Sequence, residues 1–501
     1  MNSIVGSGLG ERLRFLARDT AVYGIASALN KILALVTFPL LARHFSVDAY
    51  GTLDLLNTWA VLLTTLLLFG TDSAAARFYY QETEPAEQRQ VITQAFVWQL
   101  LVMAIVLPAG WVMAEPIAVT FGLPPEPGTE WVRLIFAQAP FFVLITYTQG
   151  LLKWTFRRTA FLLVSVGSTI ATVAGLLIVL ALDRLTLTGV FEVYLWTRAL
   201  FGVIGLWLVR DLFALPAGLG KLRMLLPFAI PFAAICMLNA FLPALERLLV
   251  GGILGAAALG YFAAGAKVAM LINLPISALE MSWGPFSLVL RDEEDAHRSF
   301  NVALKVVCAL LFGAVLLLTG IADLIVRILG SERYEGAGTV AFALCMGMAL
   351  QGVSSLTTVG IVFSLKSYLK IYSHIVLVAV ALVAIPLLAT LYGIAGAAWG
   401  SMLAMLAKTV FETWLSQRAQ RIHWDFRGVT VLGLVTLGVG VLTQLSYGTA
   451  MIAGISYVPL AALPVFAAVA WMVVLSPAER AMGIAAATSA WKRLRGNAAA
   501  I

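Results

Sequence analysis

The sequence predicts an all-α, polytopic membrane protein with about 14 transmembrane helices, organised as two pseudo-symmetric six-helix lobes plus two C-terminal helices. The 501-residue chain is 61% hydrophobic and only 12% charged, whereas soluble domains carry about 25% charged residues. Its mean hydropathy is +0.94. Apolar runs of about 20 residues, long enough to cross a bilayer, recur along the chain. This composition excludes a soluble enzyme, a disordered scaffold or a nucleic-acid module as a description of the whole chain.

Fourteen segments have the length and hydropathy of a membrane span. The first is longer than a signal-peptide core and lacks a small-residue cleavage site after it, so we count it as a span. Interior prolines such as Pro108 and Pro386 are expected to bend these helices, because neighbouring helices can satisfy the freed carbonyl groups. In order, the expected spans are 20–42, 53–76, 91–113, 131–150, 159–181, 188–209, 224–243, 258–282, 301–321, 338–364, 367–390, 393–415, 428–446 and 451–475.

Lys and Arg are distributed unevenly between the two sets of loops. With both termini in the cytoplasm, the cytoplasmic segments carry 22 of the 33 basic residues, the opposite loops carry five, and six lie in or at the ends of spans. Because basic residues accumulate in cytoplasmic loops, this asymmetry predicts cytoplasmic termini and an even number of spans. It also accounts for the pI of about 9.3 without a nucleic-acid partner.

A weak internal repeat predicts two related lobes, a common arrangement in transporters. Residues 45–52 align with residues 254–261, and in each copy a short outer loop leads to a glycine, Gly51 or Gly260, that opens the next span. The predicted parts are an N-lobe (helices 1–6) at 1–209, a C-lobe (helices 7–12) at 224–415, helices 13–14 at 428–475 and a cytoplasmic tail at 476–501.

The sequence offers no motif for catalysis. No gap between spans exceeds about twenty residues, so a soluble domain of about 100 residues has no place. There is no Walker motif for direct use of ATP. The cysteines and histidines are scattered without metal-ligating or catalytic spacing, so we expect no enzyme activity, cofactor or metal site. They are Cys236, Cys308, Cys345, His44, His297, His374 and His423.

Cationic residues at bilayer depth are the main candidates for a binding site, because such residues usually face a cavity or a partner. Lys31, Arg198 and Lys267 each lie about ten residues into a span without an acidic residue one turn away. With Lys408 they would form a cationic lumen between the lobes, suited to a phosphate or diphosphate. The candidate substrate-binding residues are Lys31, Arg198, Lys267, Lys408, Gln351 and Gln138. Lys408 could instead be neutralised by Glu412, one turn further along.

Acidic residues are candidates for binding a coupling ion. At about 100° per residue, Asp54 and Asp72 fall on one polar stripe of the second helix, together with Thr58 and Thr65. The candidate ion-coupling residues are Asp54, Asp72 and Glu280. Two alternatives remain open: Asp54 lies near the outer interface and could reach it, and Asp72 could form an interfacial salt bridge with Arg77.

Three groups of motifs carry a resemblance to a known family. They are LLARHFSVDAYG at 40–51 with FGTDSAAARFY at 69–79, WGPF at 283–286 followed by an acidic run, and YGIAGAA at 392–398. In this order and spacing they resemble the polysaccharide-transporter (oligosaccharide or O-antigen) flippases of the multidrug/oligosaccharidyl-lipid/polysaccharide exporter superfamily. The resemblance extends over about residues 15–415.

The resemblance implies alternating access that moves an undecaprenyl-diphosphate-linked oligosaccharide from the cytoplasmic to the periplasmic leaflet of the bacterial inner membrane. The product would serve surface-polysaccharide, exopolysaccharide or O-antigen assembly. Partners would be this lipid carrier, membrane lipids, H+ or Na+ in antiport, and the polysaccharide polymerase machinery. The alternatives are a cation-coupled multidrug exporter, a lipid II flippase and, in the enzyme class, a membrane polysaccharide polymerase. The excess of basic over acidic residues argues against the exporter, and the absence of a large loop between spans argues against the polymerase.

Overall fold

The chain folds into two compact units. The computed structural model describes residues 36–289, 296–364, 366–477 and 479–481, together with residues 26, 29, 30, 32 and 33. By their internal contacts, the units are Met1–Gly260 and Tyr261–Ile501, which we call unit 1 and unit 2. Residues 224–260, expected in the C-lobe, belong by their contacts to unit 1.

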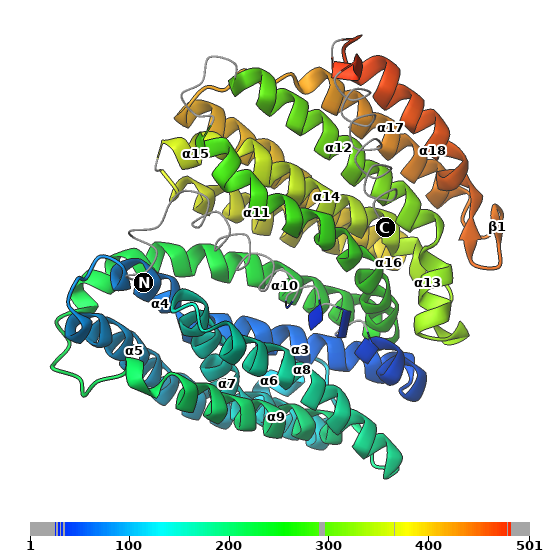
Figure 1. The fold of residues 1–501 in the computed structure, drawn as a ribbon. Coiled ribbons are helices and arrows are strands. Elements are labelled where there is room, and N and C mark those ends of the chain that lie inside the picture. Colours follow the sequence, from blue (N-terminus) through cyan, green and yellow to red (C-terminus); the bar gives the residue numbers. More distant parts are fainter. Residues whose placement is uncertain are drawn as a thin grey trace, which may run out of the picture. The chain divides into compact units, whose positions relative to one another are not determined.

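Unit 1 is a helical bundle in which α7 and α9 lie side by side, with α8 against α9 and α3 and α6 against α7 (Figure 1). The helix α10 begins in unit 1 and continues into unit 2. The elements are α3 (Val47–Leu68), α4 (Thr71–Tyr79), α5 (Pro85–Val112), α6 (Ala114–Thr120), α7 (Pro125–Trp154), α8 (Arg158–Ala181), α9 (Leu187–Leu208), the 3-10 turn η1 (Arg210–Leu212) and α10 (Leu222–Ala269).

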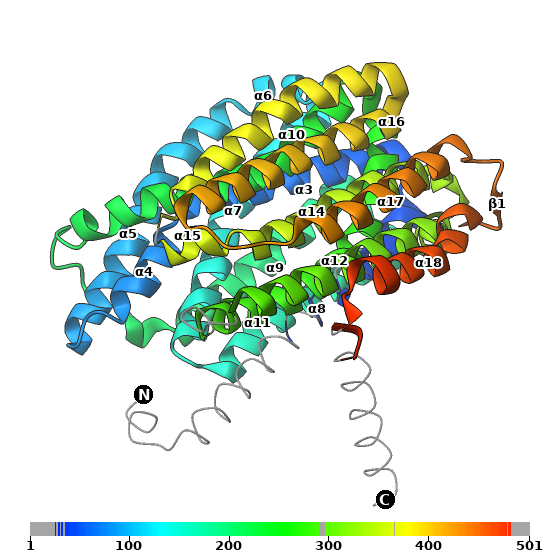
Figure 2. The same ribbon diagram turned by 90° about the horizontal axis from the view of Figure 1, so that it is seen from above.

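Unit 2 is also helical, with one short hairpin. Figure 2 shows α12, α17 and α18 side by side, and α14 packs on both α12 and α16. The elements are η2 (Met270–Ile272), α11 (Asn273–Val289), α12 (Ala296–Gly320), α13 (Ala322–Leu329), η3 (Glu332–Tyr334), η4 (Ala337–Val340), α14 (Ala341–Thr357), α15 (Val359–Phe363), α16 (Leu369–Ala419), α17 (Phe426–Leu445), β1 (Met451–Ile452), β2 (Ile455–Ser456), α18 (Tyr457–Val469) and η5 (Ala470–Val474).

The predicted fold class is confirmed. Within the described residues, 11 helical stretches are long and apolar enough to cross a membrane. Two of these, Leu222–Ser277 and Leu369–Ala419, are 56 and 51 residues long, and each covers most of two predicted spans. Non-helical backbone divides them at Gly255 and at Tyr392–Gly393. The predicted span 20–42 lies largely outside the described residues. The protein is therefore a multi-pass membrane protein.

Two of the predicted spans contain a turn or a hairpin that was not expected. The expected helix 53–76 is divided into α3 and α4, because Phe69 and Gly70 adopt left-handed backbone with φ of 50° and 64°. A Cβ on Gly70 would lie 2.7 Å from Ala229 O, so this turn also packs closely on α10. The expected helix 451–475 begins at Tyr457 instead, because β1 and β2 pair as a hairpin just before it.

The two glycines that the internal repeat aligns lie against each other within unit 1. A Cβ on Gly51 would lie 2.7 Å from Gly260 N, and a Cβ on Gly260 would lie 2.2 Å from Val47 O. The start of α3 and this part of α10 can approach so closely because neither glycine carries a side chain. Contact between equivalent positions is what a two-fold arrangement of repeats produces, and the repeat itself stays a prediction.

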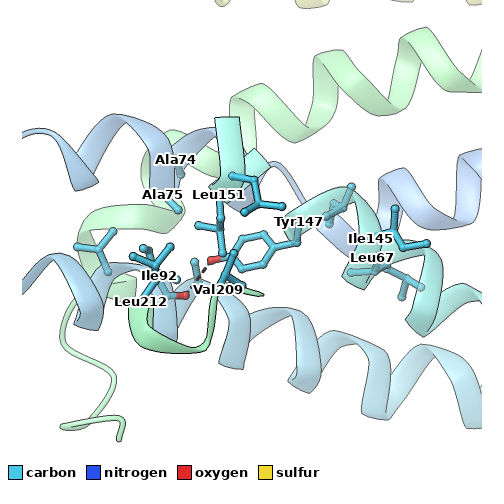
Figure 3. Packing of buried hydrophobic residues seen from close by; sticks show 14 of the residues in the cluster. Leu67, Ala74, Ala75, Ile92, Ile145, Tyr147, Leu151, Val209 and Leu212 are labelled. Atoms are coloured by element: carbon cyan, nitrogen blue, oxygen red, sulfur yellow. Dashed lines mark hydrogen bonds between the residues drawn. The ribbon is translucent and has the colours of Figure 1, made fainter. Parts of the chain in front are cut away.

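A buried tyrosine links α5 and α7 in the core of unit 1 (Figure 3). Tyr147 is fully buried among residues that include Leu67, Ala75 and Leu151. Its hydroxyl donates a hydrogen bond to the Ile92 carbonyl at 2.8 Å. The bond satisfies the only polar group that this large side chain brings into the core.

Replacing Tyr147 with Phe should lower stability by about 1 kcal/mol, because one buried hydrogen bond is lost while the packing of the ring is kept. The unfolding temperature of the purified protein in detergent, followed by intrinsic fluorescence, measures this. Tyr372→Phe is the matched control, because 52% of Tyr372 is exposed. Equal shifts for the two variants would contradict the assignment.

A second link joins the end of α9 to the start of α8. Arg157 donates to the Leu208 carbonyl at 2.8 Å and to Asp211 Oδ1 at 2.7 Å. The hydrogen bond from Arg157 holds the pKa of Asp211 below its usual value. A carboxyl with a lowered folded-state pKa stabilises the fold above its unfolded pKa, and this contribution is lost as pH falls through the folded-state pKa.

We therefore expect the unfolding temperature of the wild type to fall more steeply below about pH 4 than that of Asp211→Asn. The difference should stay below about 1 kcal/mol, because the pair is solvent-exposed. Unfolding curves recorded over a pH series measure it. Parallel pH profiles for the two proteins would contradict a stabilising role for this pair.

Candidate functional site

A buried ion pair lies inside unit 2, where α14 packs on α16. Lys408 and Glu412 are one helical turn apart on α16, and only 1% and 2% of their surface is exposed. Lys408 Nζ is 3.0 Å from Glu412 Oε2. Both helices lie in stretches with the length and hydropathy of membrane spans. Two charges are thus held in an apolar interior, where each compensates the other.

The helix α14 supplies the remaining polar contacts of this pair. Gln351 Oε1 accepts a hydrogen bond from Lys408 Nζ at 2.8 Å, and Ser354 Oγ donates to Glu412 Oε2 at 2.7 Å. Lys408 and Gln351, two of the predicted substrate-binding residues, are therefore neighbours. The alternative in which Glu412 neutralises Lys408 is confirmed. An anionic ligand would have to compete with Glu412 for this ammonium group.

His374 joins the same cluster, although the sequence analysis treated it as an isolated histidine. It is 97% buried, with 3% of its surface exposed, and its Nδ1 lies 2.7 Å from the Lys370 carbonyl. The charges of Lys408 and Glu412 both act on it. His374 and Glu412 lie nineteen residues on either side of Gly393, where α16 turns.

The turn at Gly393 folds the two halves of α16 against each other. A Cβ on Gly400 would lie 2.8 Å from Ala384 O, so the halves run past each other in close contact. The half of α16 that carries His374 therefore runs alongside the half that carries Lys408 and Glu412. The short loop expected between spans 367–390 and 393–415 was the available signal for this pairing.

Glu280, a predicted ion-coupling residue, contacts the same α14 surface. Its Oε1 accepts a hydrogen bond from Ser355 Oγ at 2.8 Å, next to the Ser354 that contacts Glu412. The Glu280 side chain itself is exposed. The structure thus brings it to the edge of the cluster, and its role in ion coupling stays a prediction.

The second polar site lies inside unit 1, between α7 and α9. Arg198 Nη1 donates to Gln138 Oε1 at 2.5 Å, so two predicted substrate contacts are again neighbours. The guanidinium carbon lies 4.0 Å from the Phe142 ring centroid, a cation–π contact. Among the described residues, no carboxylate pairs with Arg198. Gln138 is fully buried, and its Nε2 has no hydrogen-bond partner within the described part of the chain.

Asp54, the first predicted ion-coupling residue, forms a buried ion pair. Arg247 Nε lies 3.1 Å from Asp54 Oδ2, and Arg247 Nη1 lies 3.0 Å from Glu246 Oε2. The interpretation that Asp54 simply reaches the interface is therefore wrong. Arg247 lies in the gap expected between spans 224–243 and 258–282, but α10 continues through it, and two carboxylates compensate its charge within the bundle.

Asp72 does not share a helix with Asp54. It lies in the first turn of α4, beyond the break at Phe69–Gly70, so the predicted polar stripe is interrupted. The alternative salt bridge with Arg77 is wrong as well, because the Arg77 guanidinium lies over the Phe228 ring, 4.6 Å from its centroid. The ion-coupling role of Asp72 stays a prediction.

The residues predicted to form the cationic lumen do not all lie in one unit. Lys31 lies outside the described residues. Lys267 is half-buried on α10 in unit 2. Arg198 belongs to unit 1, whereas Lys267 and Lys408 belong to unit 2, so the cationic lumen stays a prediction. Across the described ranges, no three His, Cys, Asp or Glu side chains gather as a metal site.

Solved structures share this fold at low sequence identity. The structure named "Lipid II flippase MurJ, inward closed conformation" has a TM-score of 0.68 at 13% identity, covering 90% of this chain and 98% of its own. An inward-facing multidrug resistance MATE family transporter of the MOP superfamily has a TM-score of 0.61 at 16% identity, covering 78% and 95%. The MATE multidrug transporter DinF-BH in complex with R6G has a TM-score of 0.58 at 11% identity, covering 83% and 96%. At these identities the likeness concerns the fold.

Among curated proteins, no sequence matches this chain. A family model described as "Polysaccharide biosynthesis protein" matches residues 16–289, more than half of the chain. The matched range contains the motifs at 40–51, 69–79 and 283–286 on which the resemblance rests. The chain therefore belongs to the polysaccharide biosynthesis protein family.

Proposed function

We propose that this protein is a flippase that moves an undecaprenyl-diphosphate-linked oligosaccharide from the cytoplasmic to the periplasmic leaflet by alternating access. The observation that carries the proposal is its membership of the polysaccharide biosynthesis protein family. The fold shared with a structure named as a lipid II flippase supports it. The transported glycan would enter surface-polysaccharide, exopolysaccharide or O-antigen assembly through polymerase machinery.

Arg198 is the side chain of unit 1 best suited to meet the diphosphate. Its planar guanidinium can donate two parallel hydrogen bonds to a phosphate, which an ammonium group cannot do. No carboxylate among the described residues competes for it, and the unpartnered Nε2 of Gln138 supplies a further buried donor beside it. An anion bound here would satisfy both groups.

In the proposed mechanism, Lys31, Lys267 and Lys408 complete a cationic lining between the lobes, with Gln351 beside Lys408. The lobes would comprise 1–209 and 224–415, followed by helices 13–14 at 428–475 and the tail at 476–501. Both termini would lie in the cytoplasm, and the protein in the bacterial inner membrane. Coupling to an H+ or Na+ gradient by antiport would involve Asp54, Asp72 or Glu280.

The test is deletion of the gene, followed by analysis of lipid-linked glycans and of the leaflet that holds them. Accumulation of an undecaprenyl-diphosphate oligosaccharide shielded from a membrane-impermeant glycan label, and relieved by re-expression, is the expected result. An unchanged glycan pool in both leaflets would overturn the proposal.

A lipid II flippase is the second candidate, favoured by the TM-score of 0.68 with the structure of that name. In that case deletion would cause lipid II itself to accumulate in the inner leaflet. New sensitivity to toxic organic cations without glycan accumulation would instead identify a drug exporter. Loss of glycan polymerisation while flipping continues would identify the membrane polymerase.

A further inference from the structure

A groove on the surface of unit 1 combines apolar and charged residues. It lies between α8 and α9, which pack against each other, and has a volume of about 740 Å³. Its apolar part includes Ile178, Leu182 and Trp196, whose surfaces are 59%, 63% and 70% exposed. Both helices have the length and hydropathy of membrane spans, so exposed apolar side chains along them are expected to contact lipid chains.

Three charged side chains line the same groove near the α8–α9 connection. Asp183 and Arg184 lie in the connection itself, and Glu192 lies on α9, which begins at Leu187. All three charged residues are exposed. At 1.5 Å per residue, Glu192 is roughly 8 Å along the helix from Leu187. This depth is comparable with the thickness of the headgroup layer of one leaflet.

These three charges are available to a ligand. Within the part of the chain that the structure describes, none of them has an ion pair or a side-chain hydrogen bond. The threonines of the groove, in contrast, are occupied: Thr186 Oγ1 accepts from the Gly189 N–H at 3.1 Å, and Thr188 Oγ1 accepts from Trp131 Nε1 at 3.0 Å. A carboxylate on the lipid-exposed side of a span is unfavourable unless a cation compensates it.

The end of α8 fixes the backbone of two of the charged residues. The Asp183 N–H donates to the Leu180 carbonyl at 3.0 Å, and the Arg184 N–H donates to the Val179 carbonyl at 3.0 Å. This pair of bonds is a Schellman motif, and Asp183 occupies its left-handed position with φ of 52°. Glycine is the usual residue there. Aspartate gives up that easier backbone conformation but supplies a carboxylate to the groove.

The charges and the apolar surface together match a zwitterionic phospholipid. A primary ammonium group can donate hydrogen bonds to the carboxylates of Asp183 and Glu192, and a phosphate can accept them from Arg184. The Trp196 ring, one helical turn after Glu192, offers an aromatic face to the same ammonium group. A trimethylammonium headgroup has no N–H to donate. An anionic headgroup without an ammonium group would leave both carboxylates uncompensated.

We propose that the groove between α8 and α9 binds a phospholipid whose headgroup carries a primary ammonium group and a phosphate, the phosphatidylethanolamine class. Asp183 and Glu192 bind the ammonium group, Arg184 binds the phosphate, and the acyl chains lie along Ile178 and Trp196. The bound lipid bridges the end of α8 and the start of α9. The site uses none of the residues assigned to the substrate or to a coupling ion, so it does not depend on the proposed function.

The experiment measures the affinity of the purified full-length protein in detergent for phospholipids with identical acyl chains, by native mass spectrometry. Phosphatidylethanolamine should bind about tenfold more tightly than phosphatidylcholine or phosphatidylglycerol. Glu192→Gln and Asp183→Gly should each remove most of this preference, and glycine suits the backbone of the turn. Arg184→Gln should weaken the binding of all three phospholipids. The matched control Glu126→Gln, at an exposed carboxylate in the first turn of α7, should leave the preference unchanged.

Further variants separate the site from a folding defect. Glu192→Asp keeps the charge on a shorter side chain and should retain part of the preference. Without added lipid, all variants should unfold at the wild-type temperature, because the replaced side chains are exposed. Equal wild-type affinities for phosphatidylethanolamine and phosphatidylcholine would overturn the proposal, as would an undiminished preference in both carboxylate variants. Loss of the preference in Glu126→Gln as well would indicate a general effect of charge and reject the site.

Discussion

Replacing Glu412 with Gln should lower the free energy of unfolding by about 3–5 kcal/mol, the usual cost of leaving one member of a buried ion pair without its partner. Lys408 is 99% buried, with 1% of its surface exposed, so its ammonium group cannot reach water when the carboxylate is removed. Gln351 remains as a neutral acceptor at 2.8 Å, but one dipole does not replace a charge. The unfolding temperature of the purified protein, followed by intrinsic fluorescence, measures the loss.

Two controls separate the buried pair from a general effect of charge. Glu332→Gln removes an exposed carboxylate that pairs with Arg327, with 77% of the Glu332 side chain exposed, and should cost no more than about 1 kcal/mol. Lys408→Gln with Glu412→Gln should recover most of the stability lost in Glu412→Gln, because no unpaired charge remains. Additive effects of the two single substitutions would contradict the coupling between these side chains.

Arg198→Gln should reduce the rate of substrate translocation by about ten- to a hundredfold, the equivalent of losing a hydrogen bond to a charged group. Arg198→Lys keeps the charge but loses the planar pair of donors, so it should restore only part of the rate. Accumulation of the inner-leaflet lipid-linked glycan in the deletion strain, complemented with each variant, measures the difference. Unfolding temperatures of the variants show whether they remain folded.

The matched control is Arg133→Gln. Arg133 also lies over an aromatic ring, 5.8 Å from the centroid of Trp111, and it is exposed near the start of α7. Arg133→Gln should leave the rate of translocation unchanged. Full activity in Arg198→Gln would remove this side chain from the binding site, whereas equal losses in both arginine variants would indicate an effect on folding or insertion.

Much of the fold could be predicted from the sequence, because hydropathy and helical periodicity are local properties. A span needs only about 20 apolar residues, so the helices could be placed without knowledge of their neighbours. The Lys408–Glu412 pair follows from one-turn spacing on a single helix. The glycines Gly51 and Gly260 could be identified as special positions because the repeat aligns them, although their contact was not foreseen.

Side-chain contacts between different helices were harder to predict from the sequence. Arg247 falls in the gap between two expected spans, and only packing shows that Asp54, 193 positions earlier, compensates it. His374 looked isolated because its neighbours Lys408 and Glu412 reach it only after α16 turns at Gly393. The break at Phe69–Gly70 was missed because the expected span 53–76 was extended across it, although the polar residues Thr71, Asp72 and Ser73 follow Gly70 directly.

The sequence by itself thus determined the class of protein, most of its spans and the residues that could carry charge at depth. The tertiary structure alone decided which of those charges are compensated and by what. Burial makes an ion pair favourable only when the partner lies within about 4 Å, because the energy of a charge in an apolar interior depends on distance in space and not along the chain. For this reason Lys408 and Asp54 are held in ion pairs, while the described partners of Arg198 are neutral.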